Sequence, residues 1–254
     1  LPIQRESHNG WPCVFGSAVK GALREKAETA YGKASSDVLA VFGPETEKAS
    51  DNAGAIAVGD ARLLLLPVRC LSSAYRWLTC PLLLERFKRD CTRARKAARL
   101  SKPNVADGCY LGTGDDDKPL GLEEREFTRS GDVPNGVLKA LKGAIADEDS
   151  ANRLANQLAV ISDKDFSWFA RYALPVMARN DLDKNKKSKN LWYEESLPPD
   201  TVLYVTVAPR GANGIGKLIG AVPDARYIQI GGNETVGQGW LKMASYGATG
   251  EESN

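Results

Sequence analysis

Hydrophobic and polar residues follow two different periods along the chain, which indicates a mixture of helices and short strands. Residues 61–68 are mostly apolar, which is typical of a buried strand, and residues 201–208 alternate as a half-buried strand does. Helical spacing occurs at 17–30, 137–141 and 151–160. This order of elements favours an α+β fold, in which helices cover one face of a sheet.

Two serines lie where helices are expected to begin. Ser17 precedes the apolar stripe of the helix predicted at 17–30, and we expect it to be the N-cap. Ser162, followed three residues later by Asp165, forms a capping box for a further helix that Pro175 ends. A short helix is also predicted just before the last two strands, at 214–222.

A polar stretch between two strand-like segments predicts a protruding hairpin. Residues 176–180 and 191–195 have the apolar content of strands, whereas residues 183–189 are too polar to pack on their own domain. We therefore expect a hairpin over residues 176–195, with its polar tip in solvent.

A glycine-rich connection joins the last two predicted strands, at 227–230 and 240–243. Its sequence, GGNETVGQG, contains four glycines in nine residues. A simple hairpin turn needs only about two to five residues, so a ligand that approaches the backbone is one explanation. Backbone amides without side chains can hold phosphate oxygens. A plain hairpin loop explains the composition equally well.

Composition limits the classes of function. With 254 residues and 43% hydrophobic content, the chain can bury a substantial core. The net charge is only +2, so any affinity for nucleic acid must come from where the basic residues lie. No apolar run is long enough to span a membrane. Five widely separated cysteines without a CxxC pair favour a reduced, cytoplasmic chain without structural zinc.

Basic residues cluster in two places. Lys20 and Arg24 lie four residues apart near a predicted helix start, where they oppose the helix dipole and repel each other. A bound anion would offset both costs, and a solvated face is the alternative. The second cluster predicts a basic helix, which is either solvated or a surface that follows phosphates. Its members are Arg86, Lys88, Arg89, Arg93, Arg95, Lys96, Arg99 and Lys102. The acidic stretch 112–126 that follows is expected to be a flexible insertion.

Several sequence blocks occur in one order along most of the chain. They are LPIQRE at 1–6, GSAVKGALR at 16–24, FGPETEKA at 42–49, VGDARLLLLPVR at 58–69, PLLLERFKRD at 81–90, LWYEE at 191–195 and QIGGNETVGQGW at 229–240. Together they resemble the backbone, target-cleaving subunits of the type III-B CRISPR Cmr complexes, which belong to the repeat-associated mysterious protein (RAMP) superfamily. The match is weakest at about 100–135 and at 183–189.

The resemblance implies a modified ferredoxin-like core of the RNA-recognition type in a single domain. It also implies a helical or flexible insertion at 70–135 and a thumb hairpin at 176–195. Subunits of this family stack along a CRISPR guide RNA with other Cmr subunits and cleave complementary single-stranded target RNA at regular intervals, using Mg²⁺ or Mn²⁺. The chain is then expected to act in antiviral defence in the cytoplasm, with no membrane partner.

The resemblance also implies the site residues. Glu194 is the candidate for an auxiliary catalytic role, and a strand-end carboxylate paired with Lys or Arg is the alternative. The main catalytic aspartate of the relatives would precede Leu1, and Ser196 replaces a tyrosine that relatives can carry. The residues expected to contact RNA are Arg5, His8, Ser17, Lys20, Arg24, Arg179, Gly231, Gly232, Asn233, Gly237 and Gly239.

Three functions remain open at this point. The first is an RNA-guided endoribonuclease, in which a splayed nucleotide lets the 2′-hydroxyl attack the adjacent phosphate while the protein supplies positioning and charge stabilisation. The second is a filament subunit that binds guide RNA without chemistry. The third, a metabolic enzyme that binds phosphate through GGNETVGQG, lacks a catalytic constellation.

Overall fold

The computed structural model describes residues 1–44, 53–96, 98, 100–114, 118–211, 213–222 and 226–246. Expectations for residues 45–49, Arg99 and residues 115–117 fall outside these ranges. A single domain was expected, and the chain divides into two compact units. Unit 1 comprises Leu1–Cys13 and Leu63–Leu203, and unit 2 comprises Val14–Arg62 and Tyr204–Asn254.

Unit 1 is built on a mixed sheet with the strand order β1-β3-β4-β8-β5-β7-β6, and β11 pairs with β3 outside this path. The strands are β1 (Cys13–Val14), β3 (Ala61–Arg69), β4 (Tyr75–Thr79), β5 (Cys109–Gly112), β6 (Leu120–Leu122), β7 (Arg125–Asp132), β8 (Leu158–Ile161) and β11 (Val202–Tyr204). The pairs β4–β8 and β5–β7 are parallel. The long apolar run predicted as a buried strand is confirmed as β3, in which Leu63 to Leu66 are buried.

The helices of unit 1 are α3 (Pro81–Arg93), α4 (Asn135–Lys142), α5 (Glu148–Gln157) and α6 (Asp163–Tyr172). The predicted capping box is confirmed, because the Ser162 hydroxyl accepts a hydrogen bond of 3.1 Å from the Asp165 amide. α6 places Phe166 and Phe169 in the core, where the Phe166 ring meets Trp11 edge to face at 5.3 Å. Burial of these aromatic rings fixes α6, which leads directly into the hairpin.

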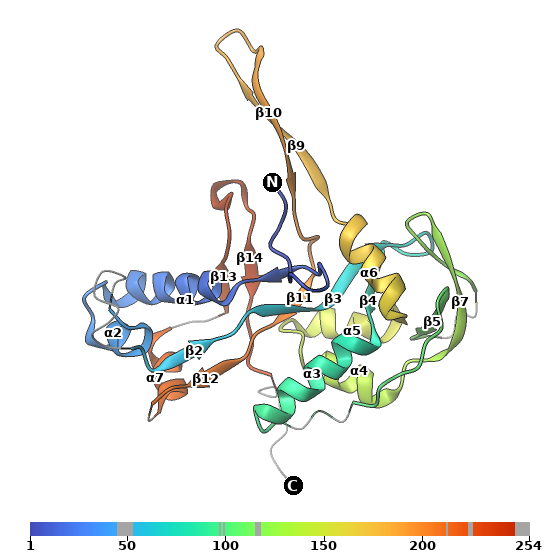
Figure 1. The fold of residues 1–254 in the computed structure, drawn as a ribbon, viewed down its shortest axis with the longest axis horizontal. Helices are drawn as coiled ribbons and strands as arrows, with labels where there is room; N and C mark the ends of the chain where they lie inside the picture. The colour runs from blue at the N-terminus through green and yellow to red at the C-terminus, as the bar shows by residue number, and fades with distance from the viewer. Residues whose placement is uncertain are drawn as a thin grey trace. The chain divides into compact units, whose positions relative to one another are not determined.

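The predicted hairpin is present in unit 1. β9 (Val176–Leu182) and β10 (Ser188–Glu195) pair in antiparallel fashion, with Glu194 opposite Met177. Figure 1 shows this two-stranded ribbon extending away from the sheet of unit 1. Most of its side chains are exposed, as the polar tip had indicated.

Unit 2 contains shorter elements. They are α1 (Gly16–Tyr31), α2 (Ser36–Phe42), β2 (Ile56–Val58), β12 (Val207–Pro209), α7 (Gly214–Ala221), β13 (Tyr227–Gln229), the 3-10 turn η2 (Glu234–Val236) and β14 (Trp240–Lys242). β2 pairs with β12, and β13 pairs with β14. The predicted helix at 214–222 and the hairpin around the glycine-rich connection are therefore confirmed.

Three expectations about elements are wrong. The helix predicted at 151–160 ends at Gln157, because Leu158–Ile161 is buried on both faces between β4 and β5 and forms β8. The strand at 201–208 is divided into β11 and β12. The region 70–135 is not an insertion outside the core, because its described residues supply β4, β5, β6 and β7 to the sheet. Among the described residues, no helix has the length and apolar content to cross a membrane.

Candidate nucleic-acid interface

The first residues of unit 1 contact the last residue of the hairpin, because Arg5 forms an ion pair with Glu195. The Arg5 guanidinium donates to Glu195 Oε1 at 2.6 Å and to the carbonyls of Gly10 and Ala170 at 2.7 and 2.8 Å. The other Glu195 oxygen accepts from the Ile3 amide at 3.1 Å. Since these contacts engage the guanidinium inside the protein, they account for Arg5 structurally, and its contact with RNA stays a prediction.

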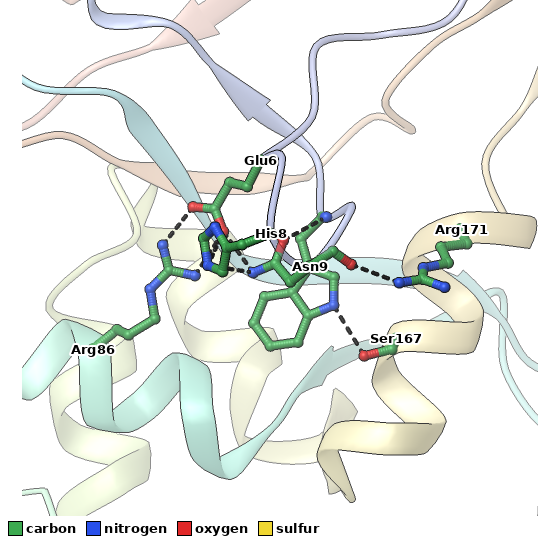
Figure 2. Close-up of polar contacts among 7 residues, drawn as sticks. Glu6, His8, Asn9, Arg86, Ser167 and Arg171 are labelled. Atoms are coloured by element: carbon green, nitrogen blue, oxygen red, sulfur yellow. Dashed lines mark hydrogen bonds and ion pairs between the residues drawn. The ribbon is translucent and has the colours of Figure 1, made fainter.

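Glu6 anchors the loop that follows. Its carboxylate accepts hydrogen bonds from Arg86 Nη1 at 2.8 Å and from Asn9 Nδ2 at 2.6 Å (Figure 2). Burial alone would raise the pKa of Glu6, but the hydrogen bonds from Arg86 and Asn9 and the charge of Arg86 outweigh it, so the pKa is lowered. His8 lies beside this pair, with Nε2 3.8 Å from Glu6 Oε2, and its side chain is exposed. The His8 side chain is therefore accessible to solvent. Its contact with an RNA phosphate stays a prediction.

Glu194 and Arg179 meet on neighbouring strands of the hairpin. Arg179 Nε donates to Glu194 Oε2 at 3.0 Å, and Trp192 Nε1 donates to Oε1 at 2.8 Å. Both carboxylate oxygens are thus engaged, and the side chain is only 15% exposed. This is the arrangement expected of a strand-end carboxylate paired with a basic residue. The catalytic role of Glu194 stays a prediction.

The start of α1 in unit 2 differs from the expectation. Ser17 is not the N-cap, because the helix begins one residue earlier, at Gly16, and no side chain of the N-cap residue bonds to it. Instead, Asp60 Oδ1 accepts from the Gly16 amide at 2.7 Å. A Cβ at Gly16 would lie 2.5 Å from the Val58 carbonyl oxygen, so only glycine allows this approach. The Ser17 side chain is left exposed and is free to contact a ligand.

Three cations gather near the start of α1. Partial burial is the main cause of a lowered pKa of Lys20, and the charges of Arg24 and Arg210 lower it further. Arg24 also donates to Glu28 at 2.6 Å and to the Gly43 carbonyl at 3.2 Å, which fixes its orientation. Lys20, Arg24 and Arg210 define what we call the α1 cation cluster. An anion would relieve their repulsion, and the exposed Arg210 was not foreseen from sequence because it lies far along the chain.

The glycine-rich connection is a compact turn that bonds mainly to itself. Gly231, Gly237 and Gly239 have positive φ angles of 103°, 82° and 77°. Asn233 is left-handed too, and its Nδ2 donates to a neighbouring side chain within the loop. A Cβ on Gly239 would meet the Ile230 carbonyl oxygen at 2.3 Å. Backbone geometry therefore explains these glycines.

Gly232 is different, because its φ is not positive and nothing lies within 4 Å of an added Cβ. Neither conformation nor packing within unit 2 requires glycine here. Close approach of an RNA phosphate or another protein surface, which was predicted for this loop, is consistent with an open backbone at this position.

The predicted basic helix is divided. α3 ends at Arg93, Arg95 has a positive φ of 55°, and Arg86 is buried against Glu6. The expected basic helix is therefore wrong for the described residues beyond Arg93, which lie outside α3, and Arg86 is not on a solvated face. Lys88 and Arg89 are exposed on the helix.

No group of three or more His, Cys, Asp or Glu residues within the described ranges is arranged to hold a metal ion. Glu6, Glu194 and Glu195, the carboxylates described above, are each paired with an arginine. The described residues thus do not fit a divalent-metal site.

The architecture and the surfaces together define a class: a mixed α+β protein with a long ribbon, a cation cluster at a helix start and an open glycine-rich turn. The chain belongs to the RAMP superfamily, whose family model matches residues 1–242. The α+β fold and the resemblance inferred from sequence are thereby confirmed.

Particular relatives are similar over nearly the whole chain. The chain is 35% identical to the CRISPR system Cmr endoribonuclease Cmr4 of Pyrococcus furiosus over an alignment of 256 positions. This alignment covers 95% of this chain and 86% of that protein. The crystal structure of oligomeric Cmr4 from Pyrococcus furiosus matches with a TM-score of 0.76 at 31% identity, covering 95% and 89% of the two chains. A cryo-EM structure of the type III-B Cmr-beta complex bound to cognate target RNA has a TM-score of 0.74 at 19% identity, covering 95% and 87%, and bears on the fold alone.

Proposed function

We propose that this chain is a backbone subunit of a type III-B CRISPR effector complex, that it binds guide RNA, and that it cleaves complementary target RNA at regular intervals. The observation that carries the proposal is the 35% identity, over 95% of the chain, to a Cmr endoribonuclease. The oligomeric form of a similar structure supports assembly with further copies of itself. Guide RNA, single-stranded target RNA and other Cmr subunits are its other partners, in the cytoplasm.

Guide binding is assigned to unit 2. The α1 cation cluster offers charge to phosphates, and Ser17 and the open backbone at Gly232 are accessible there. Contacts to phosphates position a strand without reading its bases. One protein can then accept guides of any sequence, because base pairing between guide and target supplies the specificity.

Cleavage is assigned to unit 1 and to the region of the hairpin base. If the hairpin displaces a nucleotide from the guide–target duplex, its 2′-hydroxyl can align with the adjacent phosphate for in-line attack. The 2′-oxygen loses its proton and bonds to phosphorus, the bond from phosphorus to the 5′-oxygen breaks, and that oxygen takes up a proton, which leaves a 2′,3′-cyclic phosphate and a 5′-hydroxyl. The chain's own contribution is to hold the first residues against the hairpin through Arg5 and Glu195. Dependence on a divalent ion rests on the family resemblance, and the assay below tests it.

A non-catalytic filament subunit is the second candidate, and one observation favours it. Glu194, the catalytic candidate within the chain, has both oxygens engaged by Arg179 and Trp192. These two contacts account for the Glu194 side chain as a structural group of the hairpin. In this candidate, the subunit still binds guide RNA and assembles with other copies, but it does not cleave target RNA.

The experiment is reconstitution of the complex with the full-length subunit, one of two unrelated guide RNAs and a labelled target. Both guides should bind with similar affinity that falls steeply with salt. Magnesium should then produce discrete target fragments, and EDTA should abolish them. Intact target bound along the guide in magnesium would establish the structural subunit instead, and absence of guide binding would overturn both candidates.

A further inference from the structure

An aromatic pair lies on the outer face of α6. Trp168 and Tyr172 are one helical turn apart, with ring centroids 5.7 Å apart and ring planes at 54°. The Trp168 ring packs edge to face on Phe169 at 5.1 Å, which anchors it to the core. Tyr172 is 68% exposed. The pair therefore presents a fixed indole and an exposed phenol ring to solvent.

A shallow hollow lies on each side of this pair. One, of about 360 Å³, is lined by Glu123, Glu124, Trp168, Tyr172, Leu174 and Pro175, among others. The second, of about 350 Å³, is lined by Lys164, Ser167, Trp168, Arg171 and Tyr172. Both hollows are open to solvent, which suits a base that stacks on an exposed ring and stays partly hydrated.

Charge is divided between the two hollows. Lys164 and Arg171 line one and carry positive charge, whereas Glu123 and Glu124 line the other. Arg171 Nη2 donates to the Asn9 carbonyl at 2.9 Å, which orients an exposed guanidinium (Figure 2). Lys164 is paired with Asp107 and Glu123 with Arg69, each at 3.0 Å, so Arg171 and Glu124 determine the difference between the hollows. A phosphate is attracted to Arg171 in the first hollow and repelled by Glu124 in the second.

Arg125 also contacts the aromatic pair, through the ring of Trp168. Its guanidinium carbon lies 5.2 Å from the Trp168 ring centroid, and it pairs with the buried Asp165 at 2.8 Å. A cation over the indole helps to hold the ring in place. The aromatic surface is thus preorganised before any ligand binds.

We propose that Trp168 and Tyr172 form a stacking platform for one nucleotide of the target RNA, with its phosphate toward Lys164 and Arg171. The inference rests on the proposed function and deepens it. α6 ends at Tyr172 and β9 begins at Val176, so a nucleotide on the platform lies beside the base of the hairpin. Aromatic rings flanked by cations bind single strands of any sequence, because every base has a face that stacks.

A protein partner would also favour exposed aromatic residues and arginine. The division of charge across the aromatic pair favours a nucleotide, which has an anionic phosphate at one end and a base carrying hydrogen-bond donors at the other. Carboxylates such as Glu124 accept hydrogen bonds from the amino groups of bases. The experiment therefore separates RNA binding from assembly.

The test uses the complex loaded with guide RNA, in EDTA to prevent cutting, and a target that pairs with only part of the guide. Tyr172→Ala removes the exposed ring, whereas Tyr172→Phe keeps it. Tyr31→Ala is the control, because Tyr31 is also the exposed last residue of a helix. Its hydroxyl donates to the Gly220 carbonyl at 3.1 Å, so a thermal melt first establishes that this variant is folded. Trp168→Phe tests the second ring while keeping an aromatic side chain against Phe169. Fluorescence anisotropy gives the dissociation constant of the target.

We expect Tyr172→Ala to weaken target binding about five- to 150-fold, the range for loss of one base stack. Tyr172→Phe and Tyr31→Ala should match the wild type, and Trp168→Phe should weaken binding less than Tyr172→Ala. Unchanged target affinity of Tyr172→Ala would overturn the platform and leave the proposed function standing. If Tyr172→Ala impairs assembly of the complex but leaves RNA affinity unchanged, the aromatic surface of α6 binds a protein partner. That result would also overturn the platform. A wild-type complex that binds no target would remove both proposals.

Discussion

Buried charge at Glu6 and Arg86 is the feature at the residue scale with the largest energetic consequence. Their side chains are only 9% and 10% exposed, so neither ion is well hydrated. Such a pair contributes little compared with an apolar pair, but removing one partner leaves the other charge buried and unneutralised. The loop that carries His8 depends on this contact, because Glu6 also binds Asn9.

Glu6→Gln should therefore destabilise unit 1. We expect the free energy of unfolding to fall by about 3 kcal/mol, the lower limit for breaking a buried ion pair, since glutamine keeps an acceptor for Arg86. Urea titration followed by tryptophan fluorescence measures the change. Glu85→Gln, which breaks the exposed pair with Lys102, is the control and should leave stability unchanged. Equal effects of the two substitutions would contradict the assignment.

The same pair makes stability depend on pH. The pKa of Glu6 is lowered from its ordinary value of 4.5, so its contribution is complete above about pH 4.5 and is lost as pH falls through the lowered pKa. The stability difference between wild type and Glu6→Gln should then shrink as pH is decreased below 4.5. Urea titrations at a series of pH values test this. A difference that stays constant through the acid range would rule out the linkage.

Lys20 and Arg210 should each contribute one phosphate contact to guide binding. Replacing either by alanine should weaken guide RNA binding equally for unrelated sequences and reduce the slope of log affinity against log salt by roughly 0.7. Filter binding over a salt series measures both. Lys33→Ala, an exposed lysine of the same unit outside the α1 cation cluster, should leave the slope unchanged. A sequence-dependent loss would show that these residues read bases.

Spacing along the sequence found Lys20 and Arg24 but could not find Arg210. The first two are four residues apart on one helix, which is a local relation. Arg210 approaches them only through the fold of unit 2. The partners of Arg5 and Arg86 lie 190 and 80 residues away, so the sequence could not show that these arginines pair with Glu195 and Glu6.

At the scale of elements, the sequence predicted those features that depend on neighbouring residues. The capping box of α6 and the polar tip of the hairpin at 176–195 were both identified from a few neighbouring residues. β8 was not, because its apolar run continues the helical pattern of α5 and becomes a strand only by pairing with β4 and β5. Pairing between distant strands is a tertiary effect that periodicity cannot show.

The glycine-rich turn offers a prediction that separates conformation from binding. Gly239→Ala should destabilise the β13–β14 hairpin by about 1–3 kcal/mol, because it places a Cβ against the Ile230 carbonyl at a positive φ. Trp240, the tryptophan of unit 2, reports unfolding there. Gly232→Ala should leave stability unchanged and weaken guide binding. Unchanged binding by Gly232→Ala would show that no ligand approaches this backbone.

At the scale of the whole molecule, the two units carry different parts of the proposed activity. The α1 cation cluster and the glycine-rich turn belong to unit 2, whereas the hairpin, Glu194 and the α6 platform belong to unit 1. The division itself was not predicted, because the chain passes between the units within the strands β1, β3 and β11, without a linker whose composition would mark it. The proposed function and the proposed platform thus place the surface for the guide in unit 2 and the surface for the target in unit 1.

The central claim is that repeated copies of this subunit along the guide determine where the target is cut. The most direct measurement is to map the cut positions in magnesium with two guides of different length and one matched target each. The account predicts the same constant interval between cuts with both guides, and more cuts with the longer one. An interval that changes with guide length, or cuts that follow the target sequence instead of the guide, would contradict it.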